Sequence, residues 1–295
     1  MKKVVLSVVA ALAMTATVPA LAADMPVKAA PAAPAAATSP WDVLFGTAFT
    51  TDYELRGVSQ SAHKPSVNGY FEVDYTVADW LKFYAGIHGY SLYSGFADAE
   101  FDISGGARFS WNNFGLDVGY IYYEYPDGAV NGFGSWGDVY AIPTYKVADW
   151  LTIGGVVDWS NNFNDKVCLV GSCPVGINTG VWSGNADYGY YSGNAVITLP
   201  WHPITDVTLS INPEVGRQWF NSSVTANLGA QSYTYWDVGL DINWKAITLD
   251  LRWWDTNADA TTNAVCAVNG HPGMNACDSR FVATLKFDTS ISALK

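Results

Sequence analysis

The sequence has little charge for its length. Charged residues make up 14% of the 295 positions, whereas a typical soluble domain carries about 25%. Lysine and arginine number only 15 against 27 acidic residues, and the formal net charge is −12. This balance excludes a nucleic-acid-binding protein, which needs a basic surface to neutralise phosphates. A soluble protein of this size would be expected to expose more charge.

Long hydrophobic runs are absent beyond the N-terminus. Val4–Val18 is apolar, but it is shorter than the ~20 residues that a spanning helix needs. Lys2 and Lys3 precede it and a small-x-small site, Ala20–Ala22, follows it, so residues 1–23 are predicted to be a secretory signal peptide. Residues 24–40, rich in alanine and proline, are predicted to form a periplasmic linker, which leaves residues 41–295 for the folded domain.

Cysteine is scarce, and all four cysteines lie in polar segments between patterned stretches. An exported protein folds in an oxidising compartment, where local disulfides are expected. The spacing predicts the pairs Cys168–Cys173 and Cys266–Cys277. A zinc site is the alternative, but no Cys-x-x-Cys spacing supports it. We therefore expect neither a metal nor a cofactor.

The polar and apolar residues that are present alternate with a period of two. In Tyr235–Trp254, Trp236, Val238 and Leu240 fall on one side and Asp237 and Asp241 on the other. A strand alternates its side chains in this way, whereas a helix groups them at three and four residues. The pattern predicts a hairpin that turns at Lys245–Ala246, with one purely apolar face.

Similar segments fill the rest of the chain, and together they predict twelve strands. They are Val43–Arg56, Val67–Val77, Leu81–Tyr93, Ala99–Trp111, Phe114–Tyr125, Trp136–Val147, Leu151–Asn161, Asp187–Leu199, Val207–Trp219, the two strands of Tyr235–Trp254, and Arg280–Phe287. Pro143 predicts an irregularity within its strand. Short and long connections alternate along the chain, which is typical of an outer-membrane barrel with short periplasmic turns and long extracellular loops. We predict an all-β, antiparallel transmembrane barrel in the outer membrane of a Gram-negative bacterium; a secreted β-sandwich is the alternative.

The first strand and loop carry a recognisable string. It comprises Thr51–Tyr53 (TDY), Arg56–Ser61 (RGVSQS) and Gly69–Phe71 (GYF). The string resembles the TorF-family porins, a proteobacterial group of outer-membrane proteins, over about residues 45–75. The resemblance implies a passive pore and brings no mechanism with it. The chain departs from most outer-membrane barrels at its C-terminus, because Phe287 is its last aromatic residue and Asp288–Lys295 follow.

The polar face of the strands should line the lumen, because a basic residue facing lipid at the bilayer midplane costs about 2–4 kcal/mol. The predicted pore-lining residues are Asp52, Glu54, Arg56, Glu72, Asp74, Lys82, His88, Asp102, Arg108, Asp117, Asp237, Asp241, Asp250 and Arg252. These charges either pair and plug the barrel or line a water channel, and the sequence leaves both open. Inward glycines such as Gly119 and Gly239 leave space, which favours a narrow pore.

The start of the first long loop is the candidate constriction. If the loop folds inward, Arg56 and Gln60 would narrow the lumen; alternatively, Gly57 and Ser59 simply set the loop geometry. Acidic residues at the long-loop end, such as Asp98 and Asp255, predict a preference for cations.

The predicted function is passive diffusion of small hydrophilic solutes or ions. The expected partners are outer-membrane lipid, lipopolysaccharide and the solutes themselves. A non-conducting structural or surface-interaction barrel with a plugged lumen is the first alternative, and a barrel enzyme is the second. We do not expect an enzyme, because His88 is the one histidine on a predicted strand and no Gly-x-Ser-x-Gly motif is present.

Overall fold

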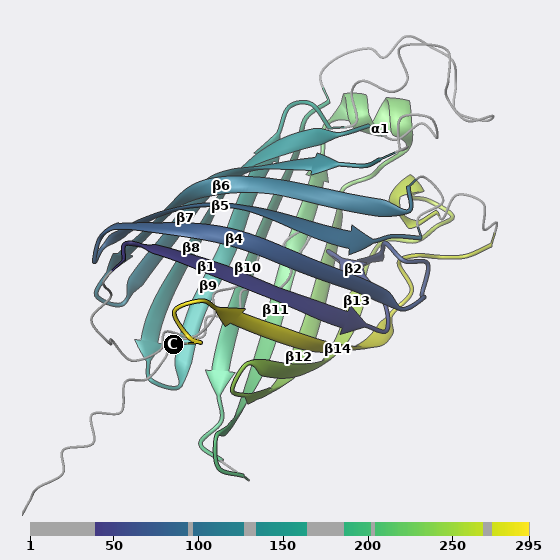
Figure 1. Ribbon diagram of the computed structural model, residues 1–295. Coiled ribbons are helices and arrows are strands. Elements are labelled where there is room, and N and C mark those ends of the chain that lie inside the picture. The colour runs from purple at the N-terminus through teal and green to yellow at the C-terminus, as the bar shows by residue number, and fades with distance from the viewer. Residues whose placement is uncertain are drawn as a thin grey trace, which may run out of the picture.

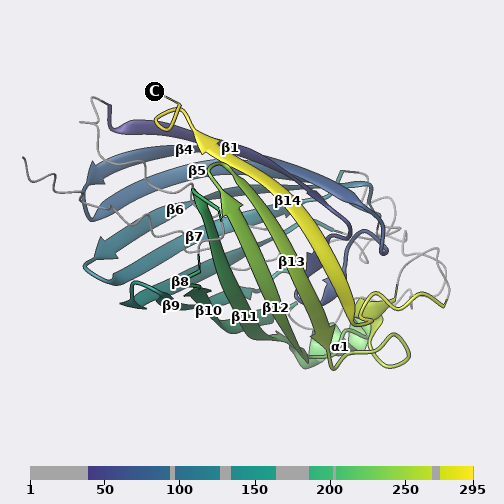
Figure 2. The ribbon, with the colours of Figure 1, turned by 90° about the horizontal axis from the view of Figure 1, so that it is seen from below.

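Twelve antiparallel strands close into a barrel (Figures 1 and 2). The computed structural model describes residues 39–93, 97–126, 134–163, 186–201, 204–267 and 273–294. The barrel strands are β1 (Trp41–Thr50), β4 (Ser66–Ala78), β5 (Leu81–Ser91), β6 (Ala99–Trp111), β7 (Phe114–Glu124), β8 (Trp136–Ala148), β9 (Leu151–Ser160), β10 (Tyr188–Thr198), β11 (Val207–Phe220), β12 (Tyr233–Trp244), β13 (Ile247–Thr256) and β14 (Arg280–Ser290). The predicted twelve-stranded antiparallel barrel is confirmed. Two smaller strands, β2 (Glu54–Leu55) and β3 (Val58–Ser59), the helix α1 (Ser222–Leu228) and a short 3-10 turn at Ala264–Cys266 lie in the loops.

Each strand pairs with its neighbours in the chain, and β1 closes the barrel by pairing with both β4 and β14. The predicted turn after β12 is confirmed: Trp244 pairs with Ile247, and Lys245 takes a positive φ of 54°. The ladder between β8 and β9 skips Ile142 and Pro143, as the proline predicts. The repeated sequence Val-Ala-Asp-Trp-Leu at residues 77–81 and 147–151 gives the same local structure twice, because both turns carry a register shift just before the alanine.

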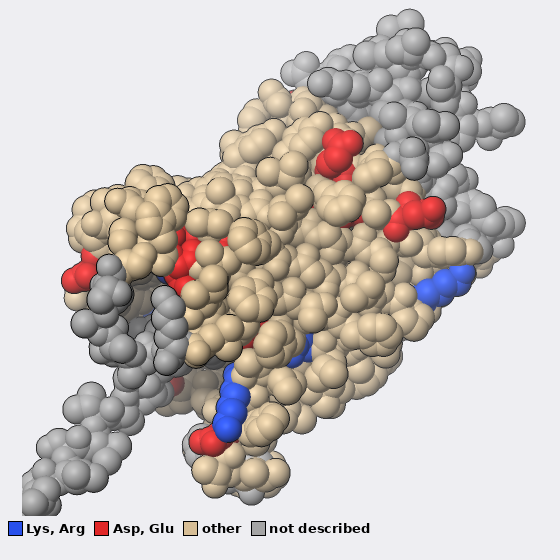
Figure 3. Space-filling model, in the orientation of Figure 1, with Lys and Arg blue, Asp and Glu red and all other residues tan. Residues whose placement is uncertain are grey.

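The outer face of the barrel is apolar. Trp236, Trp244 and Trp253 are 42%, 47% and 46% exposed, whereas Trp254, on the opposite face of its strand, is 5% exposed. Figure 3 shows a wall almost free of charged residues, with the visible acidic and basic side chains near its two ends. A closed barrel leaves no unpaired strand edge, so this apolar band can meet lipid directly. No helix among the described residues is long and apolar enough to cross a membrane.

A charge on this band should prevent stable insertion. Val238 lies at the middle of β12 and is 47% exposed on the outer face. We expect Val238→Arg to destabilise the barrel in bilayers by about 2–4 kcal/mol, which is the cost of a cation that faces lipid at the midplane. Urea titration of protein refolded into liposomes measures this change. Thr248→Arg, on the inner face of β13, is the matched control, and an equal loss in both variants would contradict the assignment of faces.

The two ends of the chain differ from the predicted boundaries. β14 continues past Phe287 to Ser290, and the following turn is fixed to β1 because the Ile291 amide donates to the carbonyl of Val43 at 2.9 Å. The predicted first strand, Val43–Arg56, is too long, since β1 ends at Thr50. The physical reason lies in Asp52, whose Oδ1 accepts hydrogen bonds from Ser59 at 2.6 Å and Ser61 at 2.7 Å and so turns the chain back on itself.

Candidate functional site

The connection between β1 and β4, residues 51–65, folds into the barrel, and we call it the inward loop. Its strands β2 and β3 form a small hairpin in which Leu55 pairs with Val58, and β2 lies within the barrel outline near the long-loop end (Figure 1). The turn of this hairpin places Arg56 and Gly57 at φ values of 50° and 78°. Ala62 and His63 also have positive φ. Three non-glycine residues in this costly conformation within one loop indicate that the surrounding contacts enforce its shape.

Arg56 carries the inward loop to the opposite wall of the barrel. Its guanidinium forms an ion pair with Asp158 on β9 and donates to Gln218 Oε1 on β11 at 2.6 Å. It also lies over the ring of Tyr190, 3.8 Å from the centroid. In the closed strand order, five strands separate β1 from β9 in either direction, β14 to β10 one way and β4 to β8 the other. The loop therefore spans the whole lumen.

The other constriction candidate, Gln60, stays on the near side. Its side-chain nitrogen donates to the carbonyl of Val58 at 3.2 Å, and its backbone contacts Tyr53 and Tyr93. Arg56, by contrast, is 4% exposed, and both of its terminal nitrogens contact the far wall. The structure thus brings one of the two predicted residues across the lumen and not the other.

The base of the inward loop is held by the start of β14. Arg280 forms ion pairs with Glu54 at 2.5 Å and with Asp52 at 3.2 Å. His63 Nδ1 lies 3.0 Å from Asp52 Oδ2, and its Nε2 lies 3.0 Å from the carbonyl oxygen of Asn275. Burial raises the pKa of Glu54 well above its ordinary value, although the charge of Arg280 acts in the opposite direction. Arg280 therefore favours the ionised form of this carboxyl group against the effect of burial.

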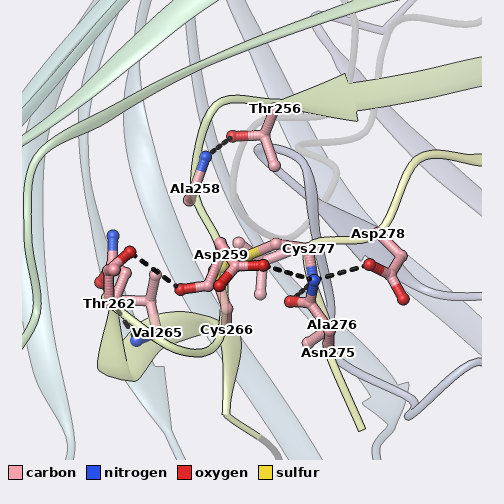
Figure 4. Close-up of a disulfide and its surroundings, with 12 residues drawn as sticks. Thr256, Ala258, Asp259, Thr262, Val265, Cys266, Asn275, Ala276, Cys277 and Asp278 are labelled. Atoms are coloured by element: carbon pink, nitrogen blue, oxygen red, sulfur yellow. Dashed lines mark hydrogen bonds between the residues drawn. A yellow bond between two sulfur atoms is a disulfide. The ribbon is translucent and has the colours of Figure 1, made fainter.

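The loop between β13 and β14 touches the same base and is closed by a disulfide. Cys266 and Cys277 are bonded, as predicted (Figure 4). The Ala276 carbonyl, next to this disulfide, accepts a hydrogen bond from the Ser59 amide at 2.8 Å. The side-chain nitrogen of Asn275 donates to Asp278 Oδ1 at 2.6 Å, and these two residues flank Ala276 and Cys277. The second predicted pair, Cys168–Cys173, lies outside the described residues. The same holds for the predicted signal peptide (residues 1–23) and for the predicted linker (residues 24–40), except for Ser39 and Pro40.

Reduction of the disulfide should loosen this contact. The two cysteines are separated by eleven positions in the sequence, and the loop-closure model assigns such a bond about 3 kcal/mol. We expect the Cys266→Ser/Cys277→Ser variant to keep its barrel but to be cleaved faster by protease in the loop between β13 and β14. Gel mobility of the unheated protein reports the barrel, and digestion rates report the loop. Equal digestion of the variant and the wild type would contradict a clamping role.

The remaining predicted pore-lining residues lie on the inner face and form ion pairs and hydrogen bonds. Arg108 on β6 reaches Glu72 on β4 at 2.6 Å and Asp117 on β7 at 2.9 Å. Lys82 pairs with Asp74 at 2.7 Å, Arg252 with Asp237 and Asp250, and Asp241 accepts from Asn212. His88 lies 3.3 Å from Asn68 Oδ1 and stacks on Tyr90, and Asp102 is buried. Contacts between strands that are not neighbours are possible only inside the barrel.

Solvent reaches this inner wall unevenly. Towards the short-turn end, the Lys82, Arg108 and Asp117 side chains are 36%, 23% and 17% exposed. Around the inward loop, Asp52, Glu54, Arg56 and Asp158 are at most 6% exposed. The glycines do not leave open space as predicted, because a Cβ at Gly239 would meet the Arg252 guanidinium and one at Gly119 would meet the Tyr140 ring. Long side chains from neighbouring strands occupy that room.

Sequence reasoning missed the inner tyrosines and Asp138. The hydroxyl of Tyr188 donates to Asp138, and those of Tyr190 and Tyr235 both donate to Glu214. All five side chains are buried. The period of two was a sufficient signal, because Tyr188 and Tyr190 share the parity of the polar positions Ser192 and Asn194 on their strand.

Comparison with known proteins gives the family. Residues 34–287 match the family described as a bacterial protein of unknown function, Gcw_chp. The chain belongs to this family. Its description does not extend to the TorF name, so that resemblance stays a prediction. No curated protein matches the sequence.

Several solved outer-membrane barrels are similar in fold to this member of the family. An outer membrane channel from Pseudomonas putida F1 is 10% identical, with a TM-score of 0.46, over 88% of this chain and 100% of that chain. The NanC porin is 7% identical, with a TM-score of 0.45, over 84% and 98%, and the KdgM porin is 8% identical, with a TM-score of 0.43, over 83% and 98%. Such distant likeness carries no information on substrate. The closed barrel and its lipid-facing band place the family member in the outer membrane.

Proposed function

We propose that the protein is an outer-membrane channel for small hydrophilic solutes or ions, closed in this conformation by the inward loop. The outer band contacts lipid and lipopolysaccharide, and the charged inner wall forms the path of the solute. Since short turns lie on the periplasmic side of such barrels, the loop blocks the extracellular half.

The observation that carries the proposal is the ion pair between Arg56 and Asp158. A loop, and not a strand of the barrel, crosses the extracellular half of the lumen. Side-chain contacts of Arg56 hold this loop to the far wall. The partial exposure of Lys82 and Arg108, 36% and 23%, supports access of solvent to the other half. Displacement of one loop would therefore join two spaces that water can reach, since loops of this kind move on nanosecond to millisecond timescales.

A non-conducting barrel is the second candidate, and the burial of the lumen charges favours it. Glu72, Asp74 and Asp102 are at most 2% exposed, so this part of the wall packs against side chains. In this case, the inward loop would be a permanent plug. An enzyme is not proposed: His88 is enclosed by Tyr90 and Tyr70 rings, and His63 is bonded on both ring nitrogens.

Conductance of the purified protein in planar bilayers separates the two candidates. The decisive comparison is between the wild type and a variant in which residues 54–59 are replaced by a short Gly-Ser linker. Steps of conductance in the variant, together with rarer openings of the wild type, support a channel closed by the loop. Silence of both proteins, with barrels verified by gel mobility, supports the permanent plug and would remove the channel from consideration.

The open channel should prefer cations. The inner wall carries more acids than bases around Glu72, Asp74, Asp237 and Asp250, and a lumen with an excess of negative charge concentrates cations. Reversal potentials of the loop-replaced variant under a KCl gradient measure this preference. A reversal potential of the opposite sign, indicating anion preference, would contradict the assignment.

A further inference from the structure

The guanidinium of Arg56 occupies a pocket that the barrel wall builds by itself. Asp158 comes from β9, Tyr188 and Tyr190 from β10, and Gln218 from β11. All four are at most 4% exposed. None of them belongs to the inward loop, and each sits on a strand that is paired on both sides. The pocket walls are therefore fixed by the barrel and do not depend on the position of the loop.

The contacts in this pocket suit a planar guanidinium better than a compact ammonium. Nη1 donates to the Gln218 amide oxygen at 2.6 Å, and Nη2 pairs with Asp158. The central carbon lies 3.8 Å from the centroid of the Tyr190 ring and 6.0 Å from that of Tyr188. Two acceptors at separate nitrogens and an aromatic ring against the flat face match the shape of this cation.

The pocket also has more acceptor capacity than Arg56 uses. Asp138 on β8 is completely buried and linked to the pocket through the hydroxyl of Tyr188. Asp138 Oδ1 and Asp158 Oδ1 are buried and accept no hydrogen bond within the described residues. Among the described residues, two buried carboxyl groups thus face one cation, and the pocket is suited to hold a positive ligand in its own right.

We propose that this pocket binds small solutes that carry a guanidinium group, and that Arg56 is a tethered competitor occupying the site when no solute is present. The inference rests on the proposed channel for the route by which a solute arrives. The pocket lies near the long-loop ends of its strands, since Asp158 is two residues from the end of β9 and Tyr188 begins β10. A solute entering from outside would meet it early and would displace the loop by replacing Arg56.

The first test measures binding of methylguanidinium to the detergent-solubilised protein by calorimetry. In the wild type, Arg56 fills the site most of the time, which weakens the apparent affinity for the solute. Arg56→Gln removes this competitor, so its apparent affinity should be higher than that of the wild type on the order of 10–100-fold. Methylurea, which has a similar shape without the charge, should not bind. Arg56→Gln/Asp158→Asn should lose the binding. Arg217→Gln is the matched control, because that arginine contacts Thr234 outside the pocket, and its affinity should equal that of the wild type.

Equal affinity of the wild type and Arg56→Gln, equal binding of methylurea, or binding that survives Asp158→Asn would overturn the proposal. A second measurement applies even if Arg56→Gln does not fold. Val58 on β3 is buried, so maleimide labelling of Val58→Cys in a protein that keeps Arg56 reports release of the loop. Labelling should accelerate with methylguanidinium and not with methylurea, and no acceleration counts against the pocket. Neither assay needs conductance: a protein that binds but never conducts refutes only the channel, and one that conducts without binding refutes only the pocket.

Discussion

Arg56→Asp is expected to convert the closed barrel into one that conducts most of the time. The substitution replaces the buried partner of Asp158 by a like charge, and Asp138 adds a second nearby carboxyl group. Breaking a buried ion pair costs about 3–5 kcal/mol. The ratio of inserted to released loop should therefore fall by roughly 10²–10³-fold. Open probability in planar bilayers measures this ratio directly.

The swapped pair provides the control for this variant. Arg56→Asp/Asp158→Arg restores opposite charges at the same two positions, so it should recover a substantial part of the closed state. Recovery would show that the pair itself holds the loop. If the single variant conducts as little as the wild type, the barrel is closed by the packed side chains of its inner wall and not by the loop.

The barrel could be predicted from the sequence because its determinants are local. Alternation with a period of two assigns every side chain of a strand to one face, and Trp236 and Asp237 were placed correctly for this reason. The turn at Lys245 joins residues only three apart, Trp244 and Ile247. Even the interruption of a ladder at Pro143 follows from a missing amide donor.

The site could be predicted only in part, because its contacts join distant parts of the chain. Arg56 meets residues 102 and 162 positions away, Asp158 and Gln218. The sequence marks Arg56 as unusual by its place at the start of a long loop, but no pattern of residues specifies its partner. The predicted end of the first strand, Arg56, was wrong for a related reason. Asp52 has the parity of an inner strand residue, but the hydrogen bonds that it accepts from Ser59 and Ser61, seven and nine positions away, end the strand.

The second large effect is expected at Arg280, the cation at the base of the inward loop. Arg280→Ala leaves Glu54 buried without its ion-pair partner, whereas Asp52 keeps its contact with His63. The loss should destabilise the inserted loop at neutral pH by about 3–5 kcal/mol. Labelling of Val58→Cys should accelerate accordingly, and openings in planar bilayers should become frequent. A labelling rate equal to that of the protein with Arg280 would contradict the role of this ion pair.

The same variant should close again in acid. Burial raises the pKa of Glu54 in the inserted loop, with Asp52 and Asp237 adding to the effect and Arg280 opposing it, whereas a solvent-exposed glutamate has a pKa of about 4.3. The inserted state therefore binds the proton more tightly, so insertion is favoured as pH falls through the raised pKa and is lost as pH rises. Without Arg280, this response should be larger than in the wild type. Arg280→Ala/Glu54→Gln has no titratable group at position 54, so its labelling rate should change less with pH than that of Arg280→Ala. A pH response equal to that of Arg280→Ala would assign the effect to another group.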